Sequence, residues 1–219
     1  MSIKDNLHHI EKELPPMVRL VAVSKTKPVE AIEEAYAAGQ RVFGENKAQE
    51  MALKYEQLPR DIEWHFIGHL QTNKVKYIAP FVSLIHSVDS LKVLKEINKQ
   101  AGKNKRVIDC LLQFHIAEEA TKFGLNMEEA EEIIGVKDDF ANVKLVGVMG
   151  MATFTPDKAQ VRREFQQLYG YFETLKKKFF ADDESFKEIS MGMSGDYRMA
   201  IEEGSTLVRI GTLIFGKRG

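Results

Sequence analysis

The chain of 219 residues is long enough for one large domain or two small ones. Hydrophobic residues make up 44% and charged residues 29%, which is typical of a globular protein with a sizeable core. The formal net charge of −1 gives no global field that would attract nucleic acid or an acidic membrane, and the single cysteine excludes an intrachain disulfide.

The N-terminal segment "MSIKDNLHHIEKELPP" has no apolar core of the signal-peptide kind, and we expect a helix over residues 3–13. No stretch of the chain approaches the roughly 18 apolar residues of a membrane span. The expected location is therefore the cytoplasm, without a membrane partner. His8 and His9 are interpreted as part of a solvated helix face, because no third ligand follows at a spacing that suits a metal.

Apolar runs alternate with segments of helical period along the rest of the chain. The first pair shows the pattern: "RLVAVS" (19–24) predicts a strand, and "PVEAIEEAYAAG" (28–39) predicts a helix that begins at Pro28 and ends at Gly39. Cys110 falls inside a later apolar run and is interpreted as an inert buried thiol. The predicted strands are 19–24, 41–46, 63–68, 82–88, 106–116, 143–151, 186–191 and 206–216.

Helical segments follow seven of these strands. Asp89 is a plausible N-cap for the fourth of them. The predicted helices are 28–39, 47–57, 71–79, 89–102, about 126–134, about 157–179 and 195–203.

Strands that alternate with helices predict a parallel sheet, and eight such units in a chain of this length fit a (β/α)8 TIM barrel. With no linker in view, we expect one domain over residues 1–219, preceded by the N-terminal helix. A doubly wound open sheet is the alternative. It would usually carry a glycine-rich turn after the first strand, where this chain reads "SKTKPV".

In a barrel of this kind the chemistry lies at the C-terminal ends of the strands. Strand 7 ends in "GMSGD" and strand 8 in "RIGT", which together supply the hydroxyls of Ser194 and Thr212, the cation of Arg209 and the bare amide of Gly211. This set is suited to a phosphate, although two ordinary turns are the alternative. Asp196 stands where a serine-hydrolase elbow requires glycine, which argues against that chemistry.

Lys25 follows strand 1, which neighbours strand 8 in a closed barrel. A partly desolvated lysine has a lowered pKa and a more nucleophilic amine. An amine beside a phosphate site suggests a Schiff base with a phosphorylated aldehyde, and pyridoxal 5′-phosphate (PLP) is the obvious candidate. The alternative is that Lys25 only pairs with a carboxylate such as Glu45.

Several longer motifs occur in order from about residue 18 to residue 217. They are "AVSKTKP", "FGENKAQE", "WHFIGHLQTNK", "IHSVDS", "TKFGL", "GMSGDYRMAIEEGST" and "VRIGTLIFG". Together they resemble the PLP homeostasis protein family, the YggS/PROSC-like PLP-binding proteins. The resemblance implies a fold-type III PLP barrel similar to the N-terminal domain of alanine racemase.

The resemblance also implies roles for individual residues. Lys25 would carry PLP as an internal aldimine, and Lys27 would be secondary. Strand 5 departs from the family pattern Gln-Val-Asn: it reads Gln113-Phe114-His115, so an imidazole could line the pocket. The expected cofactor-binding residues are Lys25, Asn46 near the ring, Arg209 facing the pyridine nitrogen, and Ser194, Gly195, Gly211 and Thr212 around the phosphate.

The function implied is intracellular PLP (vitamin B6) and amino-acid homeostasis without robust catalysis, with PLP-requiring apoenzymes as possible acceptors. An arginine beside the pyridine nitrogen disfavours ring protonation and weakens the ring as an electron sink. Racemisation needs a second acid–base group, and fold-type III racemases take it from a further domain for which this chain has no room before Gly219. We therefore expect a monomer. An amino-acid racemase, and a barrel for another phosphorylated metabolite, are the alternatives.

Overall fold

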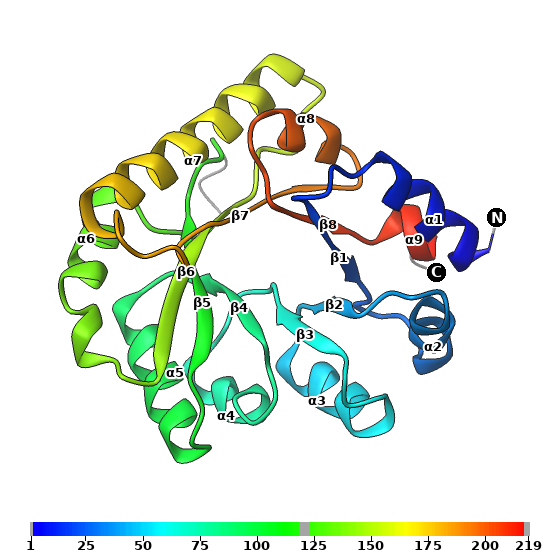
Figure 1. The fold of residues 1–219 in the computed structure, drawn as a ribbon, viewed down its shortest axis with the longest axis horizontal. Coiled ribbons are helices and arrows are strands. Elements are labelled where there is room, and N and C mark those ends of the chain that lie inside the picture. The colour runs from blue at the N-terminus through cyan, green and yellow to red at the C-terminus, as the bar shows by residue number, and fades with distance from the viewer. Residues whose placement is uncertain (1, 119–122, 217–219) are drawn as a thin grey trace.

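The computed structural model describes residues 2–118 and 123–216. Its strands run parallel and close into a barrel in chain order, with the helices outside it (Figure 1). The strands are β1 (Arg19–Val23), β2 (Val42–Glu45), β3 (Glu63–Phe66), β4 (Leu84–Val88), β5 (Ile108–Phe114), β6 (Val143–Gly150), β7 (Glu188–Met193) and β8 (Leu207–Ile210).

The helices follow the predicted segments closely, because their starts and ends depend on local sequence. Ser2 caps the first helix through a reciprocal capping box with Asp5, and Asn126 forms the same box with Glu129. The α-helices are α1 (Ile3–Glu13), α2 (Val29–Ala37), α3 (Ala48–Gln57), α4 (Val75–Ile78), α5 (Leu91–Lys103), α6 (Met127–Gly135), α7 (Lys158–Phe179), α8 (Tyr197–Glu202) and α9 (Thr212–Phe215), and the 3₁₀ turns are η1 (Thr72–Lys74) and η2 (Lys137–Asp139).

Pairing between the first and last strands closes the sheet. β1 pairs in parallel with β8, from Arg19 opposite Leu207 to Ala22 opposite Ile210. An open sheet has two edge strands, whereas each strand here pairs on both sides, so the (β/α)8 barrel is confirmed and the doubly wound alternative is wrong.

Two apolar clusters follow from the alternation of side chains along each strand. The larger one fills the layer between strands and helices, and it holds Phe43, Trp64 and Val208. The smaller one comes from the other faces of the strands and fills the barrel interior; it consists of Val21, Leu84, Leu111, Val146, Met149 and Leu207. In the part of the chain that is described, no helix is both long and apolar enough to cross a bilayer.

The cap of α5 differs from the prediction. Ser90 is the N-cap, and its hydroxyl accepts from the amide of Val93 at 3.4 Å. Asp89, the predicted cap, lies one residue earlier and contacts His69 Nδ1 at 2.9 Å. Either residue type can cap a helix, and the position at which strand β4 delivers the chain to the helix decides between them.

The predicted strand over 206–216 is wrong in its second half. β8 ends at Ile210, the last residue that has a partner on β1, and Gly211 then leads into the short helix α9. Residues beyond the barrel rim have no neighbouring strand to pair with, so the chain turns and packs against α1, as Figure 1 shows. The side chain of Asn6 donates to the carbonyl of Ile214 at 2.9 Å across this contact.

Candidate functional site

A pocket of about 450 Å³ opens at the C-terminal end of the barrel, between the loops that follow β1, β2, β6, β7 and β8. Its size is in the range of small-molecule sites. All seven predicted site residues line it: Lys25, Asn46, Ser194, Gly195, Arg209, Gly211 and Thr212. Residues that lie up to 187 positions apart in the sequence therefore share one cavity, as the strand-end argument predicts.

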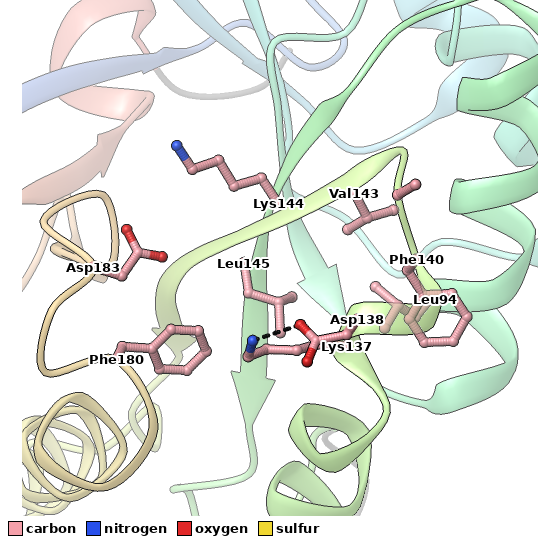
Figure 2. Close-up of a pocket in the computed structure, with 10 residues that line it drawn as sticks. Leu94, Lys137, Asp138, Phe140, Val143, Lys144, Leu145, Phe180 and Asp183 are labelled. Atoms are coloured by element: carbon pink, nitrogen blue, oxygen red, sulfur yellow. Dashed lines mark hydrogen bonds and ion pairs between the residues drawn. The ribbon is translucent and has the colours of Figure 1, made fainter.

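Another pocket lies at the opposite end of the strands (Figure 2). It measures about 290 Å³ and is lined by Val143 and Lys144 from the first residues of β6, together with Phe180. Lys137 and Asp138 form an ion pair of 2.8 Å at its edge. None of the seven predicted residues lines this pocket, and the N-terminal end of a barrel usually serves stability, so the candidate site is the pocket at the C-terminal end.

A buried ionic cluster beneath the pocket holds the turn that carries Lys25. Lys54 on α3 donates to the carbonyl of Ser24 at 2.9 Å and lies 2.7 Å from both Glu45 Oε1 and Glu50 Oε1. Glu50 also accepts from the amide of Thr26, which adopts a left-handed φ of 64°. Non-glycine residues rarely adopt this conformation, so the cluster stabilises a strained turn next to Lys25.

Glu45, the carboxylate considered as a partner for Lys25, is bonded to Lys54 and to the Ser24 hydroxyl through Oε1. Burial raises its pKa, and the charge of Lys54 opposes that shift. The other oxygen, Oε2, is buried and accepts no hydrogen bond.

A hydrogen bond joins the loops after β7 and β8. The hydroxyl of Ser194 accepts from the amide of Gly211 at 3.3 Å. Thr212 begins α9, and the first amides of a helix have no partner within that helix. Gly195 also lines the pocket, and a Cβ added there would have open space around it. Hydroxyls and backbone amides from both loops therefore line the same part of the cavity.

Arg209 brings a buried positive charge to the pocket. The residue is 4% exposed, and its guanidinium donates to Ser190 Oγ at 2.5 Å and to the carbonyl of Gly150 at 3.0 Å. Burial lowers the pKa of Arg209 to about 10, and the carboxylate of Asp196 opposes the shift. The guanidinium is therefore charged at neutral pH.

Asn46 supplies an unused acceptor, because its Oδ1 is buried and has no hydrogen-bond partner. A buried polar atom without a partner is costly, and a donor on a bound molecule would satisfy it. Lys27 also lines the pocket and donates to the carbonyl of Phe215 at 3.0 Å.

Sequence reasoning missed the apolar walls of the pocket, which are Val23, Ile67, Met151, Phe154 and Met193. Val23, Ile67 and Met151 end or follow β1, β3 and β6, so the strand-end rule could have included them.

His115 is not among the residues that line this pocket, in the part of the chain that the structure describes. β5 ends at Phe114, and the amide of His115 donates to the carbonyl of Leu125 at 3.1 Å. Among the described residues, the imidazole that could have lined the pocket is therefore not part of its lining. Thr121 and Lys122 of the "TKFGL" motif lie outside the described residues.

Cys110 is buried, as its position in an apolar run predicts. It is 0% exposed, and burial raises its pKa, so it stays protonated and inert at neutral pH.

Comparison with known proteins places the chain in a family. The sequence model of "Alanine racemase, N-terminal domain" matches residues 1–219. A pyridoxal phosphate homeostasis protein of Aquifex aeolicus is 43% identical over 91% of this chain and 87% of its own length. One from Escherichia coli K12 is 37% identical over 93% of this chain and 87% of its own length. The chain belongs to the pyridoxal phosphate homeostasis protein family.

Solved structures agree with this membership. PipY of Synechococcus elongatus, at 34% identity, superimposes with a TM-score of 0.93 without PLP and 0.90 with PLP bound, over 98% of this chain and 100% of PipY. Alanine racemase of Clostridium difficile superimposes with a TM-score of 0.79 at 15% identity, over 99% of this chain and 57% of the racemase. The second likeness shows the shared barrel fold alone.

A tyrosine hydroxyl in the pocket could act as an acid or a base, so the positions of the tyrosines matter for the chemistry of the site. All six lie on helices: Tyr36, Tyr55, Tyr77, Tyr169, Tyr171 and Tyr197. None of them lines the pocket within the described residues. Tyr197, the buried one, contacts Glu13 on α1 through its hydroxyl.

Proposed function

We propose that this protein binds PLP covalently through Lys25 and acts as a carrier of the cofactor in PLP homeostasis. One observation carries the proposal: an amine, a set of hydroxyls and amides suited to a phosphate, and a buried guanidinium line one pocket. The donor set matches the parts of PLP, and apolar side chains stand where a ring needs walls. The names of the relatives and the PLP-bound structure of PipY support the same cofactor.

Each group has a definite task in this proposal. Lys25 would hold PLP through its amine, which is suited to condense with an aldehyde with loss of one water. Ser194 and Thr212 would donate hydroxyl hydrogens to the phosphate, together with the backbone amide of Gly195. The amide of Gly211 donates to Ser194 Oγ and would orient that hydroxyl. Asn46 lies near the ring, where its unpartnered oxygen can accept a donor. PLP supplies an electron sink for carbanions when it is bound.

One feature disfavours transamination and another favours a carrier over a racemase. Arg209 would face the ring nitrogen, and its positive charge disfavours protonation there, which weakens the ring as an electron sink and leaves racemase-like proton transfer as the remaining enzymatic option. No tyrosine among the described residues lines the pocket to act on the face opposite Lys25.

The mouth of the pocket is open, with Phe154 98% exposed at its rim, which allows the cofactor to be passed to an acceptor such as a PLP-requiring apoenzyme. We propose that the protein does this as a monomer in the cytoplasm.

The attachment site is tested by loading the protein with PLP, reducing it with borohydride and mapping the added mass by peptide mass spectrometry. We expect the mass on Lys25, and none in Lys25→Ala. Lys27→Met is the matched control, because Lys27 lines the same pocket two residues away and should leave labelling of Lys25 intact. Mass on Lys27 in the wild-type protein, or no adduct at all, would refute the proposal.

The same loaded protein separates carrier from racemase. Amino acids incubated with it in D₂O should retain their α-hydrogen at nearly the uncatalysed rate. Rapid deuterium incorporation with loss of stereochemistry, absent in Lys25→Ala, would show that the protein is a racemase.

A further inference from the structure

A line of four buried polar side chains crosses the barrel interior. Arg209 on β8 donates to Ser190 Oγ on β7 at 2.5 Å, and Ser190 Oγ lies 2.9 Å from His86 Nδ1 on β4. His86 Nε2 lies 3.0 Å from His65 Nδ1 on β3. None of the four is more than 4% exposed. We call this set, Arg209, Ser190, His86 and His65, the polar column.

The donors of the polar column can be assigned in order. A guanidinium has donors only, so Ser190 Oγ must accept from Arg209. The hydroxyl of Ser190 then donates its one hydrogen to His86 Nδ1, which accepts it. This places the hydrogen of His86 on Nε2, from which it is donated to His65 Nδ1. His65 therefore carries its hydrogen on Nε2. His65 is the last residue of the column, and it lines a pocket near the N-terminal ends of the strands.

The reverse order fits less well. If His86 carried its hydrogen on Nδ1, Ser190 Oγ would accept twice, from Arg209 and from His86. Its own hydrogen would then have no acceptor among the hydrogen bonds that Ser190 makes. Buried hydroxyls without an acceptor are costly, so the order that starts at Arg209 is favoured.

Both imidazoles are neutral in this arrangement. Burial lowers the pKa of His65 to about 3, with a smaller effect of Arg19. Burial also lowers the pKa of His86 far below its usual value, and the positive charges of Arg209 and Arg19 act in the same direction. The guanidinium of Arg209 is therefore the one charge of the column, and the serine and the two histidines serve as its neutral hydrogen-bonded support.

We propose that Ser190, supported by His86 and His65, is a positioning residue that holds the Arg209 guanidinium in the orientation in which it meets the ligand. The inference rests on the proposed PLP site, because Arg209 is the group that would face the ring nitrogen. The Gly150 carbonyl holds Nη2, and Ser190 holds Nη1. Two contacts on different strands fix the plane of the guanidinium, whereas one contact leaves it able to rotate.

The first test compares two buried serines. Ser190→Ala removes the acceptor of Arg209. Ser205→Ala is the matched control, because Ser205 is 3% exposed and its hydroxyl donates to backbone carbonyls, including that of Met191 at 2.8 Å. We expect Ser190→Ala to raise the Kd for PLP about tenfold, the loss of one hydrogen bond to a charged group. We also expect a shift in the pH at which the absorption of bound PLP changes. Ser205→Ala should alter neither the Kd for PLP nor the pH at which the absorption changes.

A second pair of variants covers the case in which Ser190→Ala does not fold. His86→Asn keeps an acceptor near the position of Nδ1, whereas His86→Leu removes it. We expect the asparagine variant to keep near-normal PLP affinity and absorption, and the leucine variant to weaken both. Equal behaviour of the two variants would overturn the positioning role.

A third measurement does not depend on PLP. Spectra of ¹⁵N-histidine-labelled protein should show His86 and His65 neutral from about pH 5 to about pH 8, with the hydrogen on Nε2. A hydrogen on Nδ1 of His86, or a charged imidazole in that range, would overturn the assigned order.

If the wild-type protein fails to bind PLP, the proposed function fails. If it binds and Ser190→Ala equals Ser205→Ala, the positioning inference alone fails.

Discussion

Lys54 shows how a single buried residue can shape the site without facing it. Its ammonium is almost fully buried and touches Glu45, Glu50 and the carbonyl of Ser24, which precedes Lys25. Sequence reasoning found Lys25 because it follows an apolar strand, and the structure places it in the pocket. Lys54 was not singled out, because helical lysines usually face solvent and only the packing of α3 against the barrel buries this one.

Lys54→Met should therefore lower the free energy of unfolding by about 3–5 kcal/mol, since it leaves two carboxylates without their buried partner. Urea unfolding monitored by circular dichroism measures this. We also expect slower attachment of PLP to Lys25, because the turn that carries it loses a support. Lys95→Met, at an exposed position on α5, is the control and should change neither quantity. A Lys54→Met protein as stable as that control would contradict the role of the cluster.

At the scale of elements, the junction of β7 and α8 contains two glycines with different roles. Gly192 has a left-handed φ of 93°, and a Cβ there would lie 2.6 Å from the Cβ of Ala200. Gly195 lines the pocket and has open space beside it. The motif "GMSGD" indicated a turn but did not distinguish these roles, because the clash at Gly192 comes from the way α8 folds back on β7.

Alanine substitutions separate the two roles. Gly192→Ala should lower the free energy of unfolding by about 1–3 kcal/mol, because it combines backbone strain with a close contact. Gly195→Ala should leave stability unchanged and weaken PLP binding, because its methyl group would occupy part of the pocket. Thermal unfolding and a PLP titration of both variants test this. If Gly195→Ala binds PLP normally, the phosphate does not lie against that backbone.

At the scale of the whole molecule, closure of the barrel brings the two ends of the sequence together. β1 pairs with β8, and α9 packs against α1 (Figure 1). The site draws on both ends of the chain, since Lys25 follows β1 and Arg209 lies on β8. The site therefore forms only when the barrel closes.

The expectation of one domain over residues 1–219 predicts one cooperative unfolding transition. Trp64, the single tryptophan, is 0% exposed on β3 and reports on the barrel core by fluorescence. Far-ultraviolet circular dichroism reports on helices around the whole barrel. Both signals should change at the same urea concentration, and PLP should raise that midpoint for both. Two separate midpoints would show that the chain unfolds in parts.

The sequence by itself determined the alternation of strands and helices, the barrel class and the residues at the strand ends, because apolar periodicity, caps and turn residues act over a few neighbouring positions. It mistook 211–216 for strand, since a strand needs a partner that only the closed barrel supplies or withholds. The polar column was likewise decided by tertiary structure. Its four side chains come from four strands and meet only inside the barrel, where the low dielectric constant strengthens each hydrogen bond.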